Sequence, residues 1–181
     1  MDTTRKYNAG VRYNAPRNYP KYDPEHQFRV LTWNDWSFWK EKGYLVVPNV
    51  VPLKACDDLI KVLWQYLEAD PDDPDSWYDI PPSSSDLSTR KSIAGMVEIY
   101  HHPAMWAIRE SKNIYDLFVD LWGDEKLWVT IDRANVNIPV RNDWDFPGFL
   151  HWDIDVTNRP MPNNIQGVLS LNNNSNNSGG L

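Results

Sequence analysis

One short segment of the sequence brings together side chains that can bind a metal ion. From Phe149 to Asp155 apolar and polar residues alternate, so His151, Asp153 and Asp155 share one face of a predicted strand. An imidazole beside a carboxylate suits iron(II) in the 2-His-1-carboxylate arrangement, which leaves coordination positions open for a second anion and for oxygen. The alternative interpretation is a half-exposed strand that shows this polar face to water.

Such a site requires a third ligand, normally a second histidine, and none is identifiable in the sequence. Of the remaining histidines, His26 lies in the N-terminal segment, while His101 and His102 directly precede Pro103. We interpret the latter two as loop residues at the start of a helix. Asp155 lies two residues beyond the expected carboxylate ligand, where a supporting or solvated role is more typical.

Three helices are predicted before this segment. The first begins near Trp33, with Asn34 as a plausible N-cap and Gly43 just past the last turn. A second follows Pro52, and a third helical region follows Pro103 and carries an apolar stripe that ends at Gly123. The apolar residues of the second helix are Leu53, Cys56, Leu59, Ile60, Leu63 and Leu67, and those of the stripe are Ile114, Leu117, Phe118, Leu121 and Trp122.

Strand patterns dominate the second half of the chain. From Leu127 the apolar period changes to two. One predicted face carries Trp128, Thr130, Asp132, Ala134, Val136 and Ile138, and the other carries Val129, Ile131, Arg133, Asn135 and Asn137. Further strands are predicted at about 149–154 and 165–171, and a buried strand at 44–47. Helices followed by strands indicate an α+β or sandwich-like domain.

Several of these segments resemble a known family when they are read together. The segments at 43–48, 127–133, 151–153 and 166–171 are similar to the phytanoyl-CoA dioxygenase family, and the resemblance covers most of the chain from about Phe28 onward. It implies a double-stranded β-helix, a jelly-roll and cupin-like core, with N-terminal helices packed against it. It also implies that His151 and Asp153 bind iron(II), and that 2-oxoglutarate is the cosubstrate for hydroxylation of a small organic molecule.

The sequence departs from the family at its C-terminal end. In the family the distal histidine ligand and the arginine that binds 2-oxoglutarate follow a loop containing two glycines, and this chain ends just after Gly179 and Gly180. We therefore expect an N-terminal arm over residues 1–28 and a partial double-stranded β-helix oxygenase domain over residues 29–181. The sequence identifies no catalytic residue beyond the metal ligands and leaves open whether the chain is active.

Four polar residues on the neighbouring predicted strands are candidates for contact with 2-oxoglutarate or substrate. They are Arg133, Asn135, Gln166 and Ser170. Gln166 interrupts an apolar strand, where a buried amide would require hydrogen-bond partners. Each of the four is equally compatible with a position on the surface.

Composition narrows the classes of partner. Eighteen Lys and Arg against 25 Asp and Glu give a formal net charge of −7, which argues against binding to nucleic acid or anionic lipid. The sequence shows no signal-peptide pattern and no long apolar run, so we expect a soluble cytoplasmic protein without a membrane partner.

Two alternatives to an enzyme remain open at this point. Ten tryptophans suit a tightly packed enzyme or a module that binds ligands on exposed rings, so a non-catalytic binding or interaction module is the second hypothesis. A fragment without a function of its own is the third. An incomplete barrel would expose sheet edges, which predicts self-association through them.

Overall fold

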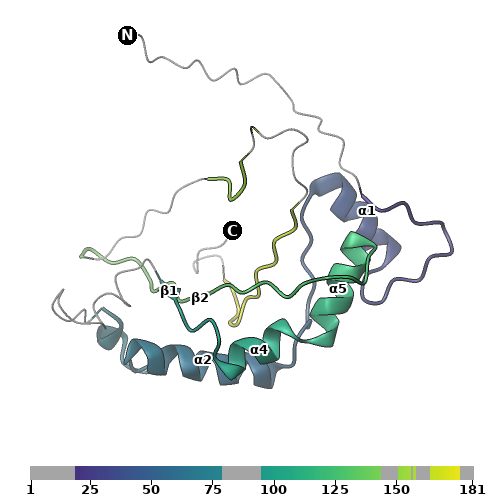
Figure 1. The fold of residues 1–181 in the computed structure, drawn as a ribbon. Coiled ribbons are helices and arrows are strands. Elements are labelled where there is room, and N and C mark those ends of the chain that lie inside the picture. Colours follow the sequence, from purple (N-terminus) through teal and green to yellow (C-terminus); the bar gives the residue numbers. More distant parts are fainter. Residues whose placement is uncertain (1–18, 79–94, 144–150, 156, 158–163, 176–181) are drawn as a thin grey trace, which may run out of the picture.

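Four α-helices and a very small sheet make up the described part of the molecule. The computed structural model describes residues 19–78, 95–143, 151–155, 157 and 164–175. The elements are α1 (Trp33–Lys42), α2 (Leu53–Leu67), the 3-10 helix η1 (Pro74–Trp77), β1 (Met96–Val97), α4 (Pro103–Arg109), α5 (Lys112–Trp122) and β2 (Ala134–Asn135). Figure 1 shows the α-helices as a curved row from α2 through α4 and α5 to α1.

Local sequence signals determine both ends of α1. Thr32 is the N-cap and forms a capping box with Asp35, since each side chain accepts a hydrogen bond from the other residue's backbone N–H. Gly43 ends the helix in the left-handed conformation, with φ 79°. The predicted helix and its glycine stop are confirmed, whereas the predicted N-cap, Asn34, is wrong because Asp35 sits three residues after Thr32 and completes the box there.

The larger core cluster forms where α2 packs against α4. The amphipathic pattern predicted after Pro52 is confirmed: α2 buries one stripe, although Leu53 at its first turn is exposed. The buried members of the cluster are Val51, Cys56, Leu59, Leu63, Leu67, Val97, Met105 and Ile108. Among the described helices α2 is the longest, and none combines the length and apolar character needed to cross a bilayer.

A second cluster joins α1 to α5 and to the segment before α1. Its buried residues are Leu31, Trp36 and Leu121. The ring of Tyr22 packs edge-on against the rings of Phe28 and Trp36. Residues 19–31 therefore lie against the helices. The part of the predicted N-terminal arm before residue 19 falls outside the described residues.

The prediction of a double-stranded β-helix core is wrong. The described residues are dominated by helices, and their only sheet has two short antiparallel strands, with Met96 opposite Asn135 and Val97 opposite Ala134. One further backbone bond, from the N–H of Val136 to the carbonyl of Gly95 at 2.8 Å, extends the pairing. A jelly-roll is therefore not what positions the candidate site.

The predicted strands failed for a physical reason. The predicted faces hold only in part: Val136 lies against the larger core cluster, whereas Trp128, predicted on the same face, is 94% exposed. Leu169 also lies against that cluster. However, within the described chain residues 164–171 make no backbone-to-backbone hydrogen bond. Residues 44–47, predicted as a buried strand, are irregular, and Tyr44 and Val46 are exposed. The alternating pattern indicates in part which side chains pack inward, but it does not indicate which backbone segments form hydrogen-bonded pairs.

Candidate functional site

The structure places the two predicted metal ligands side by side. His151 Nε2 lies 3.0 Å from Asp153 Oδ1, and both side chains are 51% exposed. Residues 151–155 form no strand, and the chain bends at Asp153 and Ile154, so the contact is made within a bend and not along a regular strand. We call His151 and Asp153 the metal pair.

The separation of these two atoms fits a shared metal ion. Histidine nitrogen and carboxylate oxygen bind divalent transition metals at about 2.1 Å, so two neighbouring ligands of an octahedral ion lie about 3.0 Å apart. In the structure the two side chains form a hydrogen bond with each other at this same distance. An ion bound to both atoms would have to displace that hydrogen bond, because the Nε2 lone pair would turn from Asp153 Oδ1 toward the metal.

Asp155, which shares the predicted polar face, is already engaged. Its Oδ1 accepts hydrogen bonds from the backbone N–H and the hydroxyl of Thr157, at 2.9 and 2.6 Å. This is an Asx-turn that closes the segment after the metal pair. Asp155 thus supports the local backbone, as the sequence suggested for a residue beyond the expected carboxylate.

The described residues do not assemble a third ligand. No group of three or more His, Cys, Asp or Glu side chains able to hold a metal occurs among them. His102 caps α4, its Nδ1 accepting a hydrogen bond from the N–H of Ala104, and His101 stacks on Trp106. The interpretation of His101 and His102 as residues at a helix entry is therefore confirmed. His26 stacks on Tyr22, far along the sequence from the pair.

The four candidate contacts of 2-oxoglutarate or substrate, namely Arg133, Asn135, Gln166 and Ser170, are all exposed. The backbone N–H of Arg133 bonds to the side chain of the preceding Asp132, and Ser170 accepts a hydrogen bond from Asn174. These contacts are local and do not point to the metal pair. Since Gln166 is not a buried amide, it needs no partner from the core.

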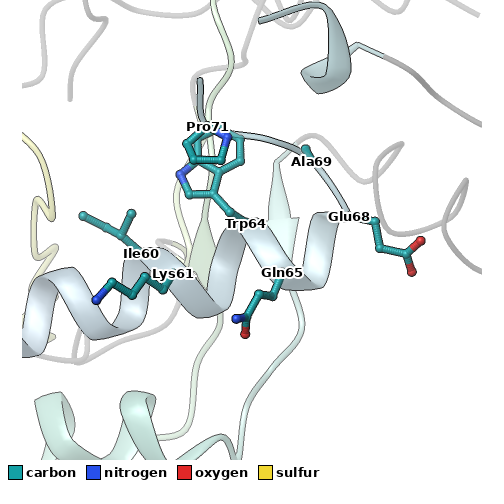
Figure 2. A pocket seen from close by; sticks show the side chains of 7 residues that line it. All are labelled: Ile60, Lys61, Trp64, Gln65, Glu68, Ala69 and Pro71. Atoms are coloured by element: carbon teal, nitrogen blue, oxygen red, sulfur yellow. The ribbon is translucent and has the colours of Figure 1, made fainter. Parts of the chain in front are cut away.

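A described hollow lies elsewhere, on the C-terminal half of α2. It has a volume of about 380 Å³ and is lined by Ile60, Lys61, Trp64, Gln65, Glu68, Ala69 and Pro71. Figure 2 shows the ring of Pro71 beside the indole of Trp64, which also lies 5.3 Å from the ring of Trp77. The charged residues that line this hollow are Lys61 and Glu68, and the lining contains no group of side chains suited to acid–base or metal chemistry.

A buried carboxylate that the sequence analysis did not single out holds the N-terminal segment in place. Asp120 on α5 is 2% exposed. Its two oxygens accept hydrogen bonds from three consecutive backbone N–H groups, those of Arg29, Val30 and Leu31, at 2.8 to 3.1 Å. We call this arrangement the Asp120 clamp. The signal in the sequence is weak: Asp120 stands between Val119 and Leu121 but outside the predicted apolar stripe, and only its burial shows that the charge requires partners.

Neighbouring groups strengthen the same junction. Asp116, one turn earlier on α5, pairs with Lys112 and Arg29, and these hydrogen bonds, that of Lys112 first, lower the pKa of its carboxyl. The hydroxyl of Tyr22 donates a hydrogen bond to the backbone carbonyl of Asp120 at 2.7 Å. Burial, and next the charge of Asp120, raise the pKa of this tyrosine hydroxyl. Arg29 and Tyr22 thus hold residues 19–31 on α5, whereas the pair of Lys112 and Asp116 lies within α5.

Comparison with protein-family models, with curated proteins and with solved structures gives no match to this chain. The geometry of the metal pair and the residues that carry the sequence resemblance therefore provide the basis for a functional proposal.

Proposed function

We propose that this chain provides the histidine and carboxylate ligands of a non-haem iron(II) site that uses 2-oxoglutarate to hydroxylate a small organic substrate. The observation that carries the proposal is the 3.0 Å separation of His151 Nε2 and Asp153 Oδ1, which suits two neighbouring ligands of one ion. The resemblance of 151–153 and its flanking segments to the phytanoyl-CoA dioxygenases supports the choice of iron and cosubstrate.

The two side chains have distinct roles in this proposal. Neutral His151 donates its Nε2 lone pair, and Asp153 adds a negative charge that offsets half of the charge of a divalent ion. Because both are half-exposed, the pair stays accessible to a chelating dianion from solvent. Iron(II) and 2-oxoglutarate, when bound, would supply the oxygen activation that no side chain of the described residues can provide.

Two protein ligands hold an ion less firmly than three, so the affinity for iron(II) should depend on the cosubstrate. The keto acid contributes two further oxygen ligands, and iron binding should therefore tighten when 2-oxoglutarate is present. A third protein ligand would come from outside the described residues or from another chain. Because a protonated imidazole cannot bind metal, affinity should also fall as the pH is lowered.

Anaerobic calorimetric titration with iron(II), with and without 2-oxoglutarate, tests the proposal. We expect binding that strengthens with the keto acid, is lost in His151→Ala and Asp153→Ala, and persists in His101→Ala, a matched control at another exposed histidine. Absence of binding to the unaltered chain, or equal binding by His151→Ala, would reject the iron site.

A second candidate function is a non-catalytic interaction module. It is favoured by large apolar side chains exposed on extended segments, Trp128 and Trp152 above all. Such a module would show no dependence on iron, and the same titration separates it from the oxygenase.

A further inference from the structure

The segment from Ile165 to Leu171 lies on the helices as an extended chain whose backbone forms no hydrogen bond with the backbone of the other described residues. Ile165, Leu169 and Leu171 pack inward on the two core clusters, while Gln166, Val168 and Ser170 are exposed. A Cβ added at Gly167 would meet the ring of Phe118, so the backbone runs directly over α5. Within the described chain its amides and carbonyls take no backbone partner, and a free edge of this kind is a template for another strand.

The composition of this segment suits strand pairing. Residues 165–171 contain no proline and no charged residue, and four of the seven are Ile, Leu or Val. Short segments with high β-propensity, no net charge and no proline pair readily with copies of themselves. Natural proteins usually protect exposed edges with lysine or proline, and neither occurs between Asn164 and Ser175.

Charge favours a second copy of the chain over a charged partner. The chain carries a formal net charge of −7, yet residues 164–175 contribute no charge to it. Two copies that meet through this segment bring no like charges face to face, whereas a basic or acidic partner would find no complementary charge there. The neutral segment is thus the place where an acidic chain can contact itself.

Exposed apolar side chains also occur on the extended segment that leads to β2. Over residues 127–131 this segment exposes 94% of Trp128, 47% of Val129 and 50% of Ile131, and Val168 is 62% exposed. Trp128 and Val129 are consecutive, so only part of this surface can face one partner. Both extended segments also pack inward on the same core cluster, through Val136 and Leu169.

We propose that two copies of the chain pair antiparallel through residues 165–171, about a two-fold axis at Val168. A two-fold interface uses the same surface on both copies, and a strand that pairs with itself across such an axis is antiparallel. Val168 is the most exposed apolar side chain of the segment, so an axis there buries it against its counterpart. Gln166 of one copy then lies opposite Ser170 of the other.

Sedimentation velocity of the full chain tests the association. Between about 1 and about 100 μM we expect a monomer–dimer equilibrium, which Val168→Lys weakens at least about tenfold, because it places two ammonium groups opposite each other. Val140→Lys is the matched control, since Val140 is 65% exposed and lies outside the segment. A monomer at every concentration, or equal weakening by both variants, would overturn the proposal.

Disulfide trapping tests the register in a Cys56→Ala background. Val168→Cys should cross-link to itself, since Cβ atoms directly opposite each other in an antiparallel pair come within reach of a disulfide. Gln166→Cys should cross-link to Ser170→Cys but not to itself. Self-linking of Gln166→Cys would mean a parallel pairing, and no cross-link at Val168→Cys would mean another interface; either result refutes the proposal. These tests need no metal, so their outcome is independent of the iron site.

Discussion

Removal of the Asp120 carboxylate should destabilise the protein more than loss of any exposed aspartate. In Asp120→Ala three backbone N–H groups lose a charged acceptor. Loss of the hydrogen bond from the N–H of buried Leu31 should cost about 2 kcal/mol, because water cannot readily replace the carboxylate. The N–H groups of Arg29 and Val30 are less buried, so water can partly replace the carboxylate. Each of these two losses should cost about 0.5 kcal/mol. The expected loss in the free energy of unfolding is therefore about 3 kcal/mol.

Urea denaturation followed by tryptophan fluorescence measures this loss, and a thermal melt should show a decrease in Tm of roughly 6 to 12 °C for a chain of this size. Asp124→Ala is the control, because exposed Asp124 accepts a hydrogen bond only from the nearby N–H of Lys126 among its described contacts, at 2.9 Å. We expect it to change stability by about 0.5 kcal/mol or less. Asp120→Asn, which keeps one acceptor oxygen, should fall between the two. Equal effects of Asp120→Ala and Asp124→Ala would refute the Asp120 clamp.

Other substitutions test separate features of the fold. Gly95→Ala should cost more than about 2 kcal/mol in equilibrium unfolding, since Gly95 has φ +75° and a Cβ there would collide with the carbonyl of Val136. Glu68→Gly should raise stability by about 0.5 to 1 kcal/mol, because Glu68 ends α2 at φ 50°; a loss would contradict that end of the helix. The pKa of Asp116 is lowered in the folded chain, first by its hydrogen bond to Lys112. Its contribution to stability is thus present above the unfolded pKa of about 4 and is lost as pH falls through the folded value. Asp116→Asn should flatten this acid limb in urea midpoints measured against pH, and an unchanged limb would argue against the pairing.

The helices could be predicted because their signals are local. The apolar spacing of α2, Pro52 before it and Gly43 after α1 all act within a few residues of the structure they determine. Pairing of strands depends on a second segment, and alternation in 133–138 or 165–171 looks the same whether the chain enters a sheet or lies on helices. This is why the side-chain faces of 134–138 were predicted and the jelly-roll was not.

The same distinction applies to the functional residues. His151 and Asp153 are two residues apart, so the sequence places them near each other, while the bend at Asp153 and Ile154 that goes with their contact was not predicted. The partners of Asp120 lie 89 to 91 residues away, and no local pattern could identify them. A third metal ligand, whether from outside the described residues or from another chain, is likewise given by no local pattern in the sequence.

The Asp120 clamp has a consequence for how the chain is made. Arg29 is added to the growing chain 91 residues before Asp120, and at about 5 to 20 residues per second this delay lasts about 5 to 20 s. Until α5 is made, Tyr22 and Phe28 have no helix there to cover them, so once they leave the ribosome their aromatic surface is open to chaperones or to other nascent chains. Docking of the N-terminal segment is therefore a late event in biosynthesis, and it must wait for α5.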